Sequence, residues 1–554
     1  MQQAEATTLV GHLTEIHGDH WVATLLPEGQ HRHVLRVEGE KILVGQPGSY
    51  VVVKHHGYQL LGLITRTWQD ELPPAPTGSR PIRRRVAMIP LGEIVDNTRF
   101  DRGVNHFPTT GSEVHVAEPR HLATLFARHR ANGLELGRLT ARPDLGVYLD
   151  PSPLFGRHLA ILGQSGSGKS WTVASLIQNT VKAMPRAHIV LLDLHGEYCW
   201  KDENGVMNSA FPESMMRYVD ARELEIPYWL LSYESLVELL IDRTDPNAPV
   251  QIAFLRDVVY ELRREANPEL KGVERLSVDS PVYFSLEDLY RMFKEANELV
   301  LDFGREKGPL FGQFTEFLVK LQSRLNDTRY DFLFRPKNRN NSDSLEDLIR
   351  DFVGLGNPKR AVTIIDLSPI PADVRPTVSA QIARLAFEFN FWNPERRRFP
   401  LLLVCEEAHA YIPRSSDKRH ESTRRAMERI AKEGRKYGVG LAVVSQRPHE
   451  LSETFLSQCG NYICMRITNP DDQDYVRELV PEGERNLMDL LTTLRRGEAI
   501  VMGEAAPLPT RFLVHRPNPE PNSNDADFQD GWTNGPEDLD VMNIVERWRR
   551  QEHH

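Results

Sequence analysis

Apolar positions along the chain follow three different patterns. Residues 1–95 hold short apolar runs separated by Gly and Pro, which are typical of the strands of a small β-barrel. From about residue 231 to 355 the apolar residues recur at helical spacing, so this part predicts a helical insertion. In the rest of the chain, short apolar strands alternate with helices, and this alternation predicts an α/β core.

These patterns divide the chain into five expected segments. They are a barrel at 1–95, a connector with the first part of the core at 96–230, the helical insertion at 231–355, the second part of the core at 356–515, and an arm at 516–554. The arm is rich in Pro, Asn, Asp and Gly, a composition that predicts flexibility. The runs that we assign to the barrel lie at 11–13, 20–25, 34–37, 49–53 and 60–64.

One stretch of the core fits the phosphate-binding P-loop, G-x-x-x-x-G-K-[ST]. It reads Gly163-Gln164-Ser165-Gly166-Ser167-Gly168-Lys169-Ser170, with an apolar strand before it and a helical pattern from Trp171 onwards. We expect backbone N–H groups and the positive end of the helix to bind phosphate oxygens. Lys169 would reach the β- and γ-phosphates, and Ser170 would hold Mg²⁺. Residues 163–171 therefore predict a site for ATP and Mg²⁺.

Two adjacent carboxylates end a later apolar strand. The run Leu401-Leu402-Leu403-Val404-Cys405 is followed directly by Glu406 and Glu407, which is a Walker B pattern. We expect Glu406 to accept water ligands of Mg²⁺ and Glu407 to orient and deprotonate the attacking water, because hydrolysis needs one carboxylate at each place. An apolar run that ends in two acids is a weak signal alone, and the upstream P-loop strengthens it.

Polar residues also follow two other predicted strands of the core. Asp193 and Glu197 come after the apolar run at 187–192, and Gln446 follows the run at 441–445. Residues at the carboxyl ends of strands line the site in open α/β sheets. We therefore expect Asp193 and Glu197 at the nucleotide and Gln446 at the γ-phosphate. The alternative for Asp193 is that it simply caps a turn.

Charge limits the ways in which this chain could bind nucleic acid. The formal net charge is −10, whereas a protein that binds DNA on one outer face is often basic. Positive groups for DNA would therefore have to be concentrated in an enclosed place. The chain has no run of 18 apolar residues and no apolar region after the start Met, and its four cysteines lack metal-type or redox-type spacing. We expect a cytoplasmic protein without a membrane span or signal peptide.

Together the motifs resemble the HerA family in the FtsK–HerA group of P-loop ATPases, and we expect a bacterial member. The resemblance covers nearly the whole chain. It implies a RecA-like ATPase core, and the N-terminal β region is similar to the barrel that such proteins share with ATP synthase subunits. It rests on the P-loop, Asp193-Leu194-His195-Gly196-Glu197-Tyr198, Glu406-Glu407-Ala408-His409, Glu433-Gly434-Arg435-Lys436-Tyr437-Gly438 and Ser445-Gln446-Arg447.

This resemblance, and not the composition, implies a homo-hexameric ring with double-stranded DNA in its central channel. Such a ring can keep positive residues in its pore while its outer face stays acidic. An arginine from the neighbouring subunit completes each active site. The resemblance indicates Arg435, slightly favoured, or Arg157, and leaves open which of them acts in trans. Family relatives act with a NurA-type nuclease, or with an antiphage effector such as a sirtuin-type NAD-cleaving enzyme or another nuclease.

Two functional hypotheses stay open at this point. The first is an ATP-driven double-stranded DNA translocase or helicase that works with a nuclease or an antiphage effector. The second is a ring-shaped scaffold that holds and activates such an effector in antiphage defence, with nucleotide controlling its assembly. ATP turnover that DNA stimulates favours the motor. Effector activation that survives Lys169→Ala favours the scaffold.

Overall fold

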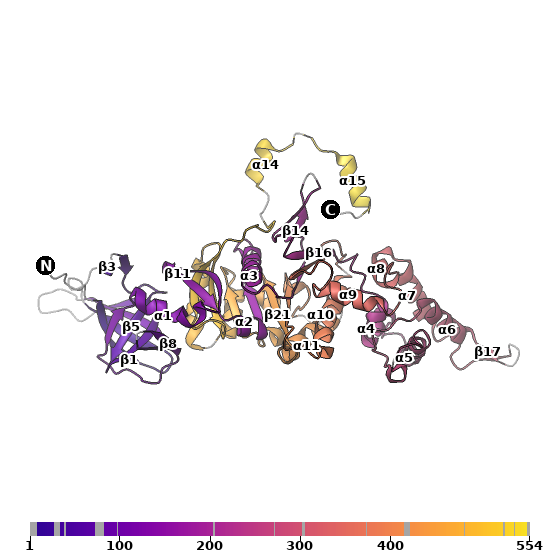
Figure 1. Ribbon diagram of the computed structural model, residues 1–554, viewed down its shortest axis with the longest axis horizontal. Coiled ribbons are helices and arrows are strands. Elements are labelled where there is room, and N and C mark those ends of the chain that lie inside the picture. Colours follow the sequence, from indigo (N-terminus) through magenta and orange to yellow (C-terminus); the bar gives the residue numbers. More distant parts are fainter. Residues whose placement is uncertain are drawn as a thin grey trace, which may run out of the picture. The chain divides into compact units, whose positions relative to one another are not determined.

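The computed structural model (Figure 1) describes most of the chain. The described residues are 8–26, 34–37, 40–71, 82–96, 98–202, 205–270, 272–301, 305–372, 374–414, 421–480, 482–523, 527–536 and 538–550. Parts of the predicted barrel and arm thus lie outside them. The chain divides into two compact units, the first within Met1–Pro185, Glu407–His409 and Gly440–Ser523, the second within Arg186–Glu406, Ala410–Val439 and Asn524–His554.

Six strands of the first unit close into a barrel. They pair in the order β2-β1-β9-β5-β6-β7, and β7 returns to β2. Buried apolar side chains fill the barrel, among them Trp21, Val51, Leu60 and Met88. The strands are β1 (Leu9–Ile16), β2 (Trp21–Leu25), β5 (Tyr50–His55), β6 (Tyr58–Glu71), β7 (Ile82–Val95) and β9 (Glu113–Val116), and β8 (Arg99–Arg102) pairs with β7. The predicted N-terminal barrel is confirmed.

Two strands differ from the sequence prediction for this barrel. The run at 34–37 forms β3 (Val34–Val37), which among the described residues pairs only with β4 (Glu40–Leu43), so its assignment to the barrel is wrong. The sixth barrel strand is β9, from the segment that the sequence assigned to the connector. Val114 and Val116 of β9 are buried, but a four-residue run is too short for a clear two-residue period.

The core strands of the first unit form a mixed sheet. Their order is β11-β10-β24-β23-β22-β12-β21. β12 (Leu159–Leu162) lies between two parallel neighbours, β21 (Val439–Ser445) and β22 (Asn461–Cys464), and all four of its residues are buried. The helix α3 (Lys169–Ala183) follows β12 after the predicted P-loop. The other strands are β10 (Leu134–Leu139), β11 (Arg142–Leu149), β23 (Glu498–Gly503) and β24 (Thr510–Val514).

The second unit contains a parallel sheet in the order β20-β13-β19-β16. Its register places Asp193 at the end of β13 opposite Asp366 at the end of β19. Glu406 follows directly after the last residue of β20. The elements are β13 (Ile189–Asp193), β16 (Met216–Asp220), β19 (Val362–Asp366) and β20 (Leu401–Cys405), with α10 (Arg375–Trp392) packed on α11 (Glu421–Tyr437).

The second unit also contains the helical insertion. Its core is aromatic, because the ring centroids of Phe293 and Phe317 lie 3.9 Å apart and those of Phe293 and Phe314 lie 4.9 Å apart. The helices are α4 (Tyr233–Leu240), α5 (Ala248–Glu265), α6 (Leu286–Glu298), α7 (Thr315–Asn326), α8 (Asp331–Phe334) and α9 (Ser344–Phe352). The fold class predicted from the sequence, an α/β ATPase core with a barrel and a helical insertion, is confirmed.

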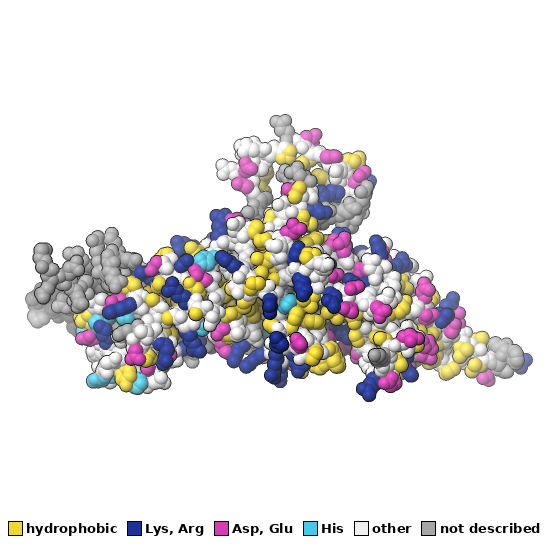
Figure 2. Space-filling model, in the orientation of Figure 1, with side chains coloured by type: hydrophobic (Ala, Val, Ile, Leu, Met, Phe, Trp, Pro, Cys, Tyr) yellow, Lys and Arg dark blue, Asp and Glu magenta, His cyan; other side chains and the backbone are white. Residues whose placement is uncertain are grey.

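The remaining elements are short or lie at the C-terminal end. They are α1 (Pro119–Arg130), α2 (Pro151–Gly156), β14 (Cys199–Lys201), β15 (Met207–Ser209), β17 (Val300–Leu301), β18 (Glu306–Lys307), α12 (Glu453–Leu456), α13 (Pro470–Leu479), α14 (Phe528–Asn534) and α15 (Val541–Arg550). Within the described part of the chain, none of the helices has the length and apolar character needed to cross a membrane. On the face drawn in Figure 2, basic side chains lie interspersed with acidic ones.

Candidate nucleotide-binding site

The loop between β12 and α3 has the backbone of a phosphate cradle. Gly166 and Gly168 have φ angles of +71° and +105°, left-handed values that favour glycine. A Cβ on Gly166 would meet no atom within 4 Å, so its backbone faces open space. A Cβ on Gly163 would instead lie 2.8 Å from the Cβ of Met465. The loop therefore packs on the protein at its start and is open where phosphate oxygens could approach backbone N–H groups.

Lys169 is the first residue of α3, and its side chain returns to the loop. The residue is only 8% exposed, and Nζ donates a hydrogen bond to the carbonyl oxygen of Gln164 at 3.3 Å. Ser170 follows in the first helical turn and is half-buried. The first turn of a helix generally has N–H groups without an intrahelical acceptor, and it carries the positive end of the helix dipole. The Lys169 cation and a positive helix end therefore lie at the open loop, with Ser170 next in the same turn, and this combination fits a polyphosphate.

Neighbouring strands hold the loop in place. The backbone N–H of Gly163 donates to the carbonyl oxygen of Ser445 at 3.2 Å. The side chain of Gln164 is anchored as well, because its Oε1 accepts hydrogen bonds from Thr468 N at 3.0 Å and from Thr468 Oγ1 at 2.6 Å. Contacts within the protein thus hold the loop at Gly163 and Gln164, and such anchoring lowers the ordering cost of binding.

A polar cavity of about 450 Å³ opens beside this loop. It brings Gln446, the residue after β21, together with Gln164 and Ser165 of the P-loop. Arg447, which was not among the predicted site residues, lines the same cavity and forms an ion pair with Glu450 at 2.6 Å. The ion pair raises the pKa of Arg447, and the more distant charges of acidic residues add to this effect. The other lining residues are His449, Asn469, Asp471 and Asp472.

Glu407 belongs to the same unit as the P-loop and has a strained backbone. Its φ is +47°, a left-handed value that costs a non-glycine residue on the order of 1–3 kcal/mol. The residue is 8% exposed, and its Oε2 lies 3.2 Å from Nδ1 of His409. Strain of this kind often marks residues that the surrounding structure holds for a function. Here it turns a buried carboxylate out of the regular strand direction.

Glu406 belongs to the second unit and is held by a tyrosine. The Tyr198 hydroxyl donates a hydrogen bond to the Glu406 carboxylate, and both residues are buried. Burial, followed by the charge of Glu406, raises the pKa of Tyr198 well above its usual value, so the hydroxyl stays a donor. Tyr198 ends the motif at 193–198, but nothing in that motif predicts its contact with Glu406. Two segments 208 residues apart in the sequence meet here.

Asp193 holds the turn that positions Tyr198. Its Oδ1 accepts backbone N–H groups from His195, Gly196 and Glu197 at 3.3, 2.9 and 3.1 Å. Its Oδ2 accepts the N–H of Tyr198 at 2.9 Å. Asp193 therefore caps the turn, which was the alternative left open by the sequence, and Glu197 lies half-buried within that turn. Burial raises the pKa of Asp193 to about 7, although the N–H donors oppose this shift.

The two arginines predicted to act in trans belong to different units, Arg157 to the first and Arg435 to the second. Arg157 precedes β12 and forms an ion pair with Glu504. The P-loop follows the other end of β12, and four strand residues at about 3.3 Å each span about 13 Å. Arg435 is exposed in the last turn of α11. Arg435 makes no side-chain hydrogen bond or ion pair with any residue that the structure describes.

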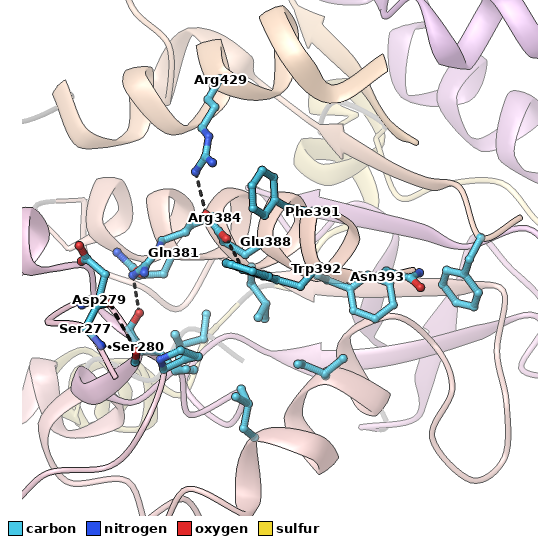
Figure 3. A pocket seen from close by; sticks show the side chains of 18 of the residues that line it. Ser277, Asp279, Ser280, Gln381, Arg384, Glu388, Phe391, Trp392, Asn393 and Arg429 are labelled. Carbon is cyan, nitrogen blue, oxygen red and sulfur yellow. Dashed lines mark hydrogen bonds and ion pairs between the residues drawn. The ribbon is translucent and has the colours of Figure 1, made fainter. Parts of the chain in front are cut away.

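A larger cavity of about 910 Å³ lies in the second unit beside α10 (Figure 3). Arg429 of α11 donates to Glu388 at 2.7 Å, and the indole N–H of Trp392 donates to the same carboxylate at 2.8 Å. Neither the acids Asp193, Glu197 and Glu406 nor Arg435 line this cavity. Its size therefore does not make it the nucleotide site.

The fold and the phosphate cradle define a P-loop ATPase. Residues 134–386 match the family model of the central domain of the helicase HerA. The DNA double-strand break repair helicase HerA of Pyrococcus furiosus is 30% identical over 419 residues, which cover 69% of this chain and 70% of that protein. The chain belongs to the HerA family.

Further relatives extend this similarity along the chain. The DNA double-strand break repair helicase HerA of Sulfolobus acidocaldarius is 28% identical over 521 residues, 90% of this chain and 95% of that protein. Among solved structures, VirB4 of Thermoanaerobacter pseudethanolicus aligns with a TM-score of 0.46 and 17% identity, covering 69% of this chain and 96% of that chain.

Proposed function

We propose that this chain is an ATP-driven motor that forms a hexameric ring and moves along double-stranded DNA in the ring's channel. The observation that carries the proposal is the open phosphate cradle at Gly166, with Lys169 turned into it, in a member of the HerA family. Relatives that are named DNA double-strand break repair helicases support DNA as the substrate.

The residues of the cradle fit ATP with Mg²⁺. Loop N–H groups and Lys169 would bind the phosphates, while Ser170 and Glu406 would hold the metal. Mg²⁺–ATP supplies the hydrolysable phosphate bond and a divalent charge that offsets the phosphate charges. Within the chain, Glu407 orients and deprotonates the attacking water, and Gln446 contacts the γ-phosphate. Asp193 and the turn that contains Glu197 act by positioning Tyr198 against Glu406.

An arginine supplied by the neighbouring subunit completes this site in the proposal. Such a guanidinium meets the charge that develops on the transferred phosphate, an effect worth about 10³–10⁵ in rate. Arg435 is the first candidate, because it is exposed and lacks a side-chain partner among the described residues. Arg157 is the second candidate, and it already has a partner in Glu504.

A nuclease of the NurA type, or an antiphage effector such as another nuclease or a sirtuin-type NAD-cleaving enzyme, is the partner that we propose. The motor would supply movement along DNA, and cleavage of DNA or NAD would be the partner's reaction. A cytoplasmic location would bring this motor together with both ATP and DNA. Co-purification of the protein from its source, followed by mass spectrometry of the bound chains, tests the identity of the partner.

The central experiment measures ATP turnover with and without linear double-stranded DNA. We expect DNA to raise turnover and Lys169→Ala to abolish it, whereas Lys182→Ala, in the last turn of the same helix, leaves it unchanged. Mass measurement by light scattering tests the hexamer. Failure of the wild-type chain to bind any nucleoside triphosphate would contradict the proposal. Effector activation that persists in Lys169→Ala would instead favour the scaffold.

A further inference from the structure

Three side chains stack beside the first turn of α3. Trp171 directly follows Ser170, and the guanidinium carbons of Arg496 and Arg516 lie 5.2 Å and 4.9 Å from the centroid of its ring. Two positive charges thus lie at one indole, a few residues from the phosphate cradle. Cation–π contacts of this kind are worth on the order of 0.5–2 kcal/mol, and they hold a long arginine side chain in one place.

Backbone contacts place both arginines at this position. The N–H of Gly497, next to Arg496, donates to the carbonyl oxygen of Ser167 in the P-loop at 2.9 Å. On the other side, Gln178 accepts a hydrogen bond from Asn518 N at 2.9 Å and donates one to the carbonyl oxygen of Pro519 at 2.8 Å.

Helix geometry connects these contacts to the indole. Gln178 is seven residues after Trp171, so the two side chains lie on the same face of α3. The chain segment around Arg516 is therefore tied along the face that carries Trp171. This anchored segment is the beginning of the arm for which the sequence predicted flexibility, and the anchoring gives these first residues a defined place beside the cradle.

The stack is open to solvent on the arginine side. Trp171 is half-buried, whereas Arg496 is exposed and the Arg516 side chain is 70% exposed. Arg516 forms an ion pair with Glu520. A planar guanidinium that packs on an aromatic ring keeps its other face for a second flat group and keeps N–H donors at its edge. A nucleotide base with its ribose has both a flat face and edge acceptors.

The position of the stack also separates it from the γ-phosphate side of the loop. Gln164, Ser165 and Gln446 line the cavity on that side, and neither Trp171 nor the two arginines do. We propose that Trp171, Arg496 and Arg516 form the subsite for the base and ribose of the bound nucleotide, with the purine ring stacked on an arginine that Trp171 supports. This inference rests on the proposed function and adds the residues that recognise the nucleoside.

The experiment compares two ligands that share the phosphates and differ in the nucleoside. Dissociation constants for ADP and for inorganic tripolyphosphate, both with Mg²⁺, are measured by calorimetry for the wild-type protein, Trp171→Ala, Arg496→Ala and Arg516→Ala. Stacking on a base is worth about 1–3 kcal/mol. We therefore expect ADP to bind about tenfold more weakly to Trp171→Ala, Arg496→Ala and Arg516→Ala, with less than a twofold change for tripolyphosphate.

Arg495→Ala is the matched control. Arg495 is adjacent to Arg496 and 70% exposed, but it pairs with Glu498 at 3.7 Å and not with the indole, so we expect no change in either constant. Equal weakening of ADP and tripolyphosphate would overturn the inference, because the arginines would then bind phosphate. Unchanged ADP binding in Arg516→Ala would overturn it as well, and this exposed position decides the matter if Trp171→Ala does not fold. If neither ligand binds the wild-type protein, the proposed function itself fails.

Discussion

Tyr198 donates a hydrogen bond to Glu406, and this contact joins the turn after β13 to the end of β20. Hydrogen bonds to charged groups contribute about 1.5–3 kcal/mol. We expect Tyr198→Phe to lower kcat for ATP about tenfold and to raise the Mg²⁺ concentration needed for half-maximal turnover. A steady-state titration of Mg²⁺ at saturating ATP measures both effects.

Tyr218→Phe is the control for this prediction. The Tyr218 hydroxyl donates to Asp366 at 2.9 Å in the same sheet, so the substitution removes an equivalent hydroxyl without touching Glu406. We expect a small change in kcat and an unchanged Mg²⁺ requirement. Equal effects of the two substitutions would mean that Tyr198 acts through the stability of the sheet and not through Glu406.

Asp193 gives the folded protein a pH-dependent stability. Its pKa is raised by burial from 3.8 to about 7, so between about pH 4 and pH 7 the unfolded chain loses a proton that the folded chain keeps. The free energy of unfolding therefore falls as pH rises through this window, by up to about 1.4 kcal/mol per pH unit, and levels off above pH 7. Asp193→Asn lacks this contribution.

Thermal unfolding of both proteins between pH 4.5 and 7.5 tests this sign. The substitution loses part of the turn, so its Tm is lower at every pH, but we expect the deficit relative to the wild type to shrink as pH rises. A constant deficit would show that the four N–H donors keep Asp193 ionised throughout the window.

The left-handed backbone of Glu407 allows function to be separated from stability. Glu407→Gln keeps the size of the side chain and removes the proposed base, so we expect kcat to fall about 10²–10⁴-fold with little change in ATP affinity. Glu407→Gly also removes the proposed base, but glycine accepts a φ of +47° without strain. We expect the glycine variant to be inactive and to have a Tm at least as high as that of the glutamine variant.

Single-turnover ATP hydrolysis and thermal unfolding of the two variants provide the comparison. If Glu407→Gln keeps a kcat above a tenth of the wild-type value, Glu407 is not the general base. A lower Tm for Glu407→Gly would show that the contact of the carboxylate with His409, at 3.2 Å, outweighs the backbone strain.

Local patterns made the phosphate loop predictable, whereas long-range pairing did not show in the sequence. The motif from Gly163 to Ser170 is local, because Gly166 and Gly168 have positive φ angles and Gly163 packs closely against Met465. The contact of Tyr198 with Glu406 depends on which strands become neighbours, and no spacing rule encodes that choice. The place of β9 in the barrel also depends on long-range pairing, because its four residues pair with β1 on one side and with β5 on the other.

The positions of Arg157 and Arg435 lead to a test of the arginine that acts in trans. We propose that one of these two arginines completes the site of a neighbouring subunit, and complementation between inactive variants tests which one. Lys169→Ala removes the P-loop lysine, and Arg435→Ala removes the proposed arginine. Each variant alone is expected to assemble into rings and to lack ATP turnover. Arg435→Ala is expected to keep its nucleotide binding.

Mixing these two inactive variants restores some complete sites if Arg435 acts in trans. At an interface where an Arg435→Ala subunit supplies its P-loop and a Lys169→Ala subunit supplies its Arg435, both groups are intact. Random mixing in equal amounts makes about a quarter of the interfaces complete, so we expect turnover of up to about a quarter of the wild-type value in a ring whose sites act independently. An arginine that acts within its own subunit gives no recovery.

Two further sets of variants control for position in α11 and test the second candidate, Arg157. Lys436→Ala, also in the last turn of α11, should keep wild-type turnover. Arg157→Ala mixed with Lys169→Ala tests the second candidate, with Glu504→Gln as a control for loss of the ion pair alone. Full turnover by Arg435→Ala and Arg157→Ala as single variants would contradict both assignments, since a guanidinium that stabilises the transition state cannot be removed without a large loss of rate.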